Sequence, residues 1–132
     1  MAAYLECSYQ SVDGLSLYYR DYGGQSDKPV LLCMPGLTRN SADFDELAQE
    51  LAPQFRILCA DQRGRGKSAY ASDSATYTPV VYVDDMQRLL DHAGVLQVTL
   101  IGTSLGGLMS MMMAVALGDR IKGIVLNDIG PD

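Results

Sequence analysis

Tryptophan is absent from the 132 residues, histidine occurs once and cysteine three times. Cys7, Cys33 and Cys59 form no Cys-x-x-Cys pair and no cluster with histidine, which excludes the common spacings of structural zinc sites. Because their number is odd and each lies in an apolar, strand-like stretch, we expect three reduced, buried thiols in a cytoplasmic protein rather than disulfides. No metal site is expected.

Positive charge is also scarce. Lysine and arginine number 10 against 16 aspartates and glutamates, for a formal net charge of −6, and no basic run reverses this balance locally. A negatively charged protein is repelled by phosphate backbones and by anionic lipid headgroups. Nucleic acids and membranes are therefore not expected as partners.

Long hydrophobic runs are rare and interrupted. The N-terminus carries Glu6 and no extended apolar stretch, so no signal peptide is expected. Residues 98–117 are uncharged over about the length of a membrane span. Three glycines and two serines interrupt that segment, however, which favours a short strand followed by a buried helix.

Strand-like runs alternate with helix-like stretches along the rest of the chain. Residues 4–10 and 15–22 flank Asp13-Gly14, a pair typical of hairpin turns. Further strands are predicted at 30–34, 55–60, 98–102 and 121–127, with helices at 41–51, 79–93 and 105–117 between them. The pattern predicts a three-layer α/β/α domain whose sheet is mostly parallel after an N-terminal antiparallel hairpin.

The segment around Ser104 combines a strand, a tight turn and a helix. Apolar residues 98–102 end in Gly102-x-Ser104-x-Gly106, and a run rich in Leu, Met and Ala follows. Serine in this context is a candidate nucleophile, because the sharp turn lifts its hydroxyl clear of the sheet and requires small neighbours. The Leu105 N–H, at the helix start, is a candidate oxyanion donor. The alternative is an ordinary glycine-rich turn.

A second loop, Pro35-Gly36-Leu37, follows the predicted strand at 30–34. Parallel strands end at the same edge of a sheet, so this loop is expected beside the Ser104 turn. The backbone N–H of Leu37 is then a candidate second oxyanion donor. The alternative is a plain turn, since Pro-Gly pairs mark turns in many settings.

A third loop, residues 61–68, ends in Gly66-Lys67-Ser68 and resembles the end of a phosphate-binding P-loop. That motif needs a glycine five positions before its second glycine, where this chain has Asp61, and no apolar helix follows Ser68. Nucleotide binding is therefore excluded. Asp61 and Arg63 are instead expected to fix a tight loop at the strand ends.

Together these motifs resemble those of the α/β-hydrolase fold superfamily. Pro35-Gly36-Leu37, Asp61-x-Arg63-Gly64-x-Gly66-x-Ser68 and Gly102-x-Ser104-x-Gly106-Gly107 occur in its order and spacing. The resemblance covers nearly the whole chain and points to the esterase, lipase and C–C-bond hydrolase branches. It implies that Ser104 is the nucleophile and that the N–H groups of Leu37 and Leu105 form the oxyanion hole. It also implies a small-molecule carbonyl substrate and no cofactor.

The chain departs from the family in its other catalytic residues. The family order is nucleophile, acid and then histidine, and no histidine follows Ser104. His92 lies at the end of the helix predicted at 79–93 and is expected to be out of reach of the hydroxyl. Asp128, after the last strand, is a candidate acid or else a loop-capping residue. The adjacent Asp84 and Asp85 are expected to be solvated.

Residues 1–132 are therefore expected to form a partial domain. It would hold the first six strands of the fold and lack the later strands, a lid and the catalytic histidine. We predict a serine hydrolase of esters or related carbonyl compounds that is nearly inactive as this chain alone. The alternative is a non-catalytic scaffold or interaction module. The strand at 121–127 would be an open apolar edge, available to a second copy or to a complementing C-terminal half.

Overall fold

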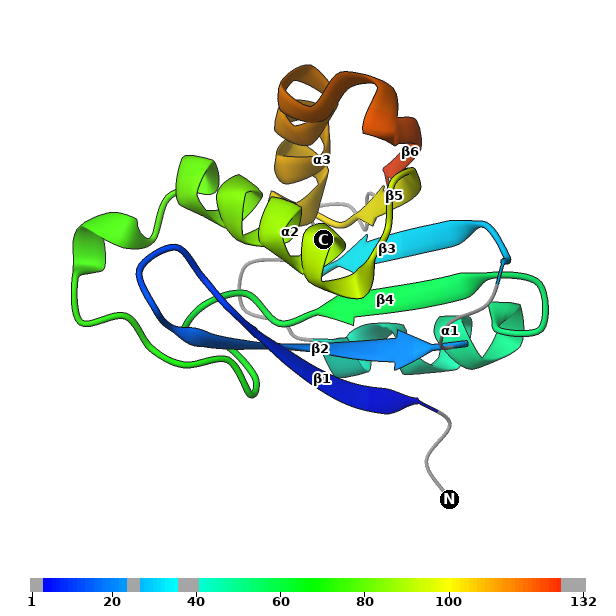
Figure 1. The fold of residues 1–132 in the computed structure, drawn as a ribbon, viewed down its shortest axis with the longest axis horizontal. Helices are drawn as coiled ribbons and strands as arrows, with labels where there is room; N and C mark the ends of the chain where they lie inside the picture. Colours follow the sequence, from blue (N-terminus) through cyan, green and yellow to red (C-terminus); the bar gives the residue numbers. More distant parts are fainter. Residues whose placement is uncertain (1–3, 24–26, 36–40, 127–132) are drawn as a thin grey trace.

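A single six-stranded sheet organises the chain (Figure 1), with the strand order β1-β2-β4-β3-β5-β6. This computed structural model describes residues 4–23, 27–35 and 41–126. The strands pair in antiparallel fashion from β1 to β2 and from β2 to β4, and in parallel fashion from β4 through β3 and β5 to β6. Their bounds are β1 Leu5–Gln10, β2 Ser16–Tyr22, β3 Val30–Met34, β4 Arg56–Ala60, β5 Val98–Gly102 and β6 Ile121–Leu126.

Helices cover both faces of this sheet, as Figure 1 shows. Leu32, Met34 and Leu100 point to one face, where they pack against Met86 of α2 and Met109 of α3. On the other face, a smaller cluster joins β3 and β4 to α1. The helical segments are η1 Ser41–Phe44, α1 Asp45–Leu51, η2 Ser74–Thr76, α2 Pro79–Ala93, α3 Leu105–Leu117 and η3 Gly118–Arg120. The predicted three-layer fold, with its antiparallel hairpin, is confirmed.

Local signals set the ends of α2. The Thr78 hydroxyl accepts a hydrogen bond from the Val81 N–H, and Pro79 occupies the first turn, where its missing N–H costs nothing. Gly94 ends the helix in the left-handed conformation, with φ of 73°. The chain then turns into β5 within four residues, so the helix runs back across the sheet toward the amino ends of its strands.

The cysteines are free in the described part of the chain. Cys33 and Cys59 are buried and face each other across the parallel β3–β4 pair. The neighbouring Cys33 thiol, together with burial, raises the pKa of Cys59. Cys7, on β1, is half-buried rather than fully buried. Among the described residues, no helix is both long enough and apolar enough to cross a bilayer.

One buried arginine joins three distant parts of the chain. Arg63 is fully buried and makes two hydrogen bonds of 2.8 Å to Asp85 on α2. It also contacts Asp13 in the β1–β2 turn, at 2.9 and 3.1 Å. These bonds hold the pKa of Asp13 below its usual range, and Asp85 raises the pKa of Arg63. The loop after β4 is thereby tied to the hairpin and to α2.

The expectation that Asp85 is solvated is wrong. Its side chain is 1% exposed, and burial raises its pKa even though Arg63 lies beside it. Asp84, one residue earlier, forms an exposed pair with Arg88 on the same helix at 3.6 Å. Adjacent helical residues point about 100° apart, so one carboxylate reaches the interior and the other reaches solvent.

Replacing Arg63 with alanine is expected to lower the free energy of unfolding by about 3–5 kcal/mol, because Asp85 becomes a buried carboxylate without its cation. Urea denaturation measures the change. The matched control is Arg88→Ala, which removes an exposed pair and should cost less than about 0.5 kcal/mol. Equal effects of the two substitutions would show that the buried pair has no special role.

Candidate active site

Ser104 lies between the end of β5 and the start of α3, in the strand–turn–helix arrangement that the sequence predicts. Its backbone has φ of 56° and ψ of −113°, and it is the one residue other than glycine with positive φ in the described ranges. A side chain is disfavoured in that region, and such strain collects at functional sites. Ser104 is exposed among the described residues.

Two glycines make this turn feasible. A Cβ atom on Gly106 would overlap the carbonyl oxygen of Met34 at the end of β3. A Cβ atom on Gly102 would overlap the carbonyl group of Gly106. The start of α3 thus lies in close contact with the ends of both β3 and β5. Any side chain at either position would push Ser104 away from the edge of the sheet.

The first turn of α3 leaves one N–H open beside Ser104. The N–H groups of Gly106 and Gly107 donate to the carbonyl oxygens of Thr103 and Ser104, at 2.9 Å each, and Leu108 also donates to Ser104. The Leu105 N–H has no such backbone acceptor within the described part of the chain. A free N–H at a helix start favours negative charge, which suits the predicted oxyanion donor.

The second predicted donor, Leu37, lies outside the described residues. Residues on both sides of its loop form hydrogen bonds to neighbouring segments. The Met34 carbonyl accepts a hydrogen bond of 3.2 Å from the Thr103 N–H, which ties the end of β3 to the Ser104 turn. The Ser41 N–H donates to the Asp61 carboxylate at 2.6 Å.

The 61–68 loop is fixed from within by Asp61 and Ser68. The second Asp61 carboxylate oxygen accepts from the Lys67 N–H at 2.9 Å, and the Ser68 hydroxyl donates to the Asp61 carbonyl at 2.7 Å. Ser68 in turn accepts from the Tyr18 N–H of β2 at 2.8 Å. No helix follows directly after Ser68. These contacts agree with the structural role expected for Asp61.

His92 lies far from Ser104, as expected. Its Nδ1 is 2.8 Å from the hydroxyl of Tyr19, at the carboxyl end of α2. Tyr19 belongs to β2, which lies three strand positions from β5 in the sheet, whereas Ser104 follows the end of β5. At a strand spacing of about 4.8 Å, β2 and β5 are about 14 Å apart, which is well beyond hydrogen-bond reach. Within the described ranges, no cluster of three or more His, Cys, Asp or Glu side chains is arranged to hold a metal ion.

Asp128, the candidate acid, also lies outside the described residues. The last residue of β6, Leu126, is in register with Gly102 of β5. The chain therefore leaves β6 at the same edge of the sheet as the Ser104 turn.

Comparison with known proteins decides the family. The model of the alpha/beta hydrolase fold matches residues 29–132. The chain belongs to the α/β-hydrolase fold family. An α/β hydrolase of known structure from Novosphingobium aromaticivorans superposes on all of the chain and on 46% of its own length, with a TM-score of 0.92 and 48% identity.

Curated proteins similar to this chain include a hydrolase and a lipase. A 3-hydroxybutyrate-oligomer hydrolase of Cupriavidus necator is 38% identical over 86% of the chain and 39% of its own length. An sn-1-specific diacylglycerol lipase of Mus musculus is 30% identical over 89% of the chain and 38% of its own length. The chain thus spans less than half the length of these relatives.

The sequence did not reveal the partners of Asp61 and Arg63, which shape the loop beside the site. Asp61 contacts Ser41, which lies twenty residues earlier in the sequence. No local sequence pattern predicts this contact. The ion pairs of Arg63 reach 22 and 50 residues along the chain. The available signal was the Asp-x-Arg-Gly-x-Gly-x-Ser motif. It indicated that Asp61 and Arg63 fix the loop but did not identify the residues they contact.

The Gly106→Ala substitution is expected to destabilise the fold by about 1–3 kcal/mol or more, because the added methyl group overlaps the Met34 carbonyl. Gly123→Ala on β6 is the control. A Cβ atom there would lie 3.8 Å from Thr99, an ordinary contact, so its midpoint of urea denaturation should hardly move. A tolerated Gly106→Ala would contradict the close approach described above.

Proposed function

We propose that the protein is a serine hydrolase acting on carboxylic esters or related carbonyl compounds, with Ser104 as its nucleophile. The observation that carries the proposal is the strained backbone of Ser104, exposed at the end of β5 beside the open Leu105 N–H. Family membership supports it, and the relatives named above as an oligomer hydrolase and a diacylglycerol lipase favour an ester substrate.

The proposed reaction has two steps. The Ser104 oxygen bonds to the carbonyl carbon while its proton passes to a base, and the N–H groups of Leu105 and Leu37 stabilise the negative oxygen that forms. The alcohol leaves with that proton and an acyl-enzyme remains. Water then attacks the acyl carbon by the same route, which releases the acid and restores the Ser104 hydroxyl.

The base is the component that the described residues do not supply. A base must lie within about 3 Å of the serine hydroxyl, and His92 instead contacts Tyr19 on β2, three strand positions from β5. Asp128 remains a candidate acid, because the chain leaves β6 at the Ser104 edge.

A second candidate function is a non-catalytic interaction module. The observation that favours it is β6, at the end of the sheet, with Val125 and Leu126 more than half exposed. Under this alternative, loss of the Ser104 hydroxyl would leave every measurable property of the protein unchanged.

The 132-residue chain alone is expected to hydrolyse p-nitrophenyl acetate only weakly. A catalytic site without its base typically retains about 10³–10⁴-fold acceleration over water. That residual acceleration comes from the oxyanion hole and binding and survives loss of the serine, so Ser104→Ala and the control Ser8→Ala, on an exposed position of β1, should both keep a rate close to that of the unaltered chain. Efficient turnover by the isolated chain would contradict the missing base. Turnover that is efficient and also retained by Ser104→Ala would contradict the nucleophile.

A further inference from the structure

Two buried thiols lie side by side in the middle of the sheet. Cys33 of β3 and Cys59 of β4 are Cα partners in a parallel pair of strands (Figure 1), and neither residue is more than 1% exposed. Residues in register on neighbouring parallel strands point to the same face, and both side chains belong to the cluster that α1 covers. Both thiols are free, so the structure holds a reduced dithiol that the proposed reaction of Ser104 does not use.

The spacing of the two residues suits a disulfide bond. Neighbouring strands lie about 4.8 Å apart, and the Cα atoms of bonded cysteines lie about 4.4–6.8 Å apart. Side chains that stand perpendicular to the sheet keep their Cβ atoms at about the strand spacing, so closure draws these atoms together by about 1 Å. The thiols already interact, because the Cys33 thiol, together with burial, raises the pKa of Cys59.

Cys7, the third cysteine, lies out of reach of both. It belongs to β1 and packs against the cluster on the opposite face of the sheet. At a strand spacing of about 4.8 Å, β1 is about 10 Å from β4 and about 14 Å from β3. Cysteines whose Cα atoms are more than about 7 Å apart cannot be joined without backbone movement. The fold therefore selects the pair of Cys33 and Cys59.

One short helix covers this pair. α1 has seven residues, its N-cap Phe44 makes no side-chain capping hydrogen bond, and Ala48 is the one residue within α1 that is fully buried. A helix this short has little stability of its own, and such segments open locally without unfolding of the whole chain. Opening of α1 exposes both thiols together. It also removes the burial that raises the pKa of Cys59, which favours the reactive thiolate.

We propose that Cys33 and Cys59 form a modification site, which a small peroxide oxidises to an intramolecular disulfide and a dithiol reduces again. One thiolate attacks an oxygen of the peroxide, whose O–O bond breaks, and a sulfenic acid forms while the alcohol of the peroxide, or water from hydrogen peroxide, leaves. The second thiol then attacks the sulfenic sulfur, and water leaves. In total the two thiols lose two protons and two electrons, which reduce the peroxide. The inference does not depend on the chemistry of Ser104.

Oxidation of the pair acts on the Ser104 turn through β3. Met34 follows Cys33, and its carbonyl oxygen accepts the hydrogen bond of 3.2 Å from the Thr103 N–H. β3 lies between β4 and β5, so a bond that draws Cys33 toward β4 moves this carbonyl away from β5. The Thr103 N–H is therefore expected to exchange with solvent faster in the oxidised chain than in the reduced chain.

The test treats the folded chain with hydrogen peroxide and then counts its free thiols in urea. The count should fall by two from its initial three. The mass should fall by about 2 Da, as two hydrogens are lost, and dithiothreitol should restore both values. Peptide mapping of the unaltered chain should place the cross-link between Cys33 and Cys59. This map identifies the pair even where a cysteine variant fails to fold.

Alanine variants provide the matched controls. Cys33→Ala and Cys59→Ala should each form no intramolecular disulfide, whereas Cys7→Ala should form the bond as the unaltered chain does. Ser104→Ala should also form it, which separates this test from that of the proposed function.

A pair of glycine substitutions tests α1 as the route of access. Ala48→Gly should speed formation of the disulfide about fivefold, because glycine disfavours a helix by about that factor relative to alanine. The control is Ala116→Gly at an exposed position of α3, which packs on the other face of the sheet. It should react at the rate of the unaltered chain.

A folded chain that keeps all its thiols in peroxide and forms a disulfide only in urea would overturn the proposal. So would a cross-link that includes Cys7, or covalent dimers in place of the intramolecular bond, because the register of β3 and β4 would then not select the pair. Equal rates for Ala48→Gly and Ala116→Gly would overturn the route through α1. Unchanged hydrogen exchange at Thr103 would overturn the link to the Ser104 turn.

Discussion

The close approach of α3 to the end of β3 is the constraint on which the candidate site depends. Gly106 leaves no room for a Cβ atom next to the Met34 carbonyl, and Gly102 leaves none next to Gly106. With the helix start this near to two strand ends, the connecting residue can turn only through a backbone conformation with positive φ. Ser104 occupies that position, and among the described residues the Leu105 N–H beside it has no backbone acceptor.

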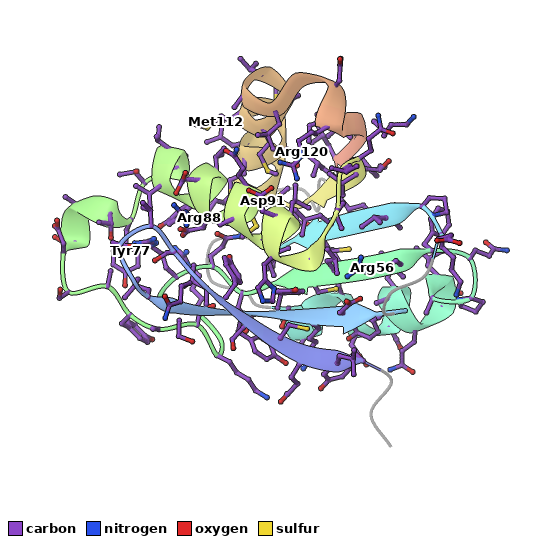
Figure 2. All side chains as sticks on the ribbon, viewed as in Figure 1. Arg56, Tyr77, Arg88, Asp91, Met112 and Arg120 are labelled. Carbon is purple, nitrogen blue, oxygen red and sulfur yellow. The ribbon has the colours of Figure 1, made fainter. Side chains whose placement is uncertain are left out.

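The loops around this turn are held by buried carboxylates rather than by apolar packing. Asp61 joins Ser41 to Lys67, and Arg63 joins Asp85 to Asp13. Surface ion pairs contribute little to stability. Removing one partner of a buried, bidentate pair lowers the free energy of unfolding strongly, because the other charge is left buried and unpaired. Figure 2 labels a contrasting, exposed pair of 3.0 Å between Arg120 of η3 and Asp91 near the end of α2. By the same reasoning, this exposed pair is expected to contribute less than the buried pair of Arg63 and Asp85.

The sequence was informative wherever the signal was local. The Asp13-Gly14 turn, the Thr78-Pro79 helix start and the Gly102–Gly106 turn each depend on the conformation of a few consecutive residues, and all three features occur where they were predicted. Asp85 was misjudged because its partner is 22 residues away and reaches it only through the fold. The helix expected at 41–51 begins as the 3-10 turn η1, and only from Asp45 onward is it an α-helix. Neither Leu37 nor Asp128 lies in the described ranges, so their roles remain predictions.

The central claim is that the Ser104 hydroxyl is the reactive group of the molecule. The most direct measurement treats the chain with a fluorophosphonate probe and maps the modified serines by mass spectrometry over time. The account predicts that Ser104 is modified first and that the Ser104→Ala chain acquires no early adduct. Modification of Ser8, Ser74 and Ser104 at similar rates, or a first adduct on another residue, would contradict it.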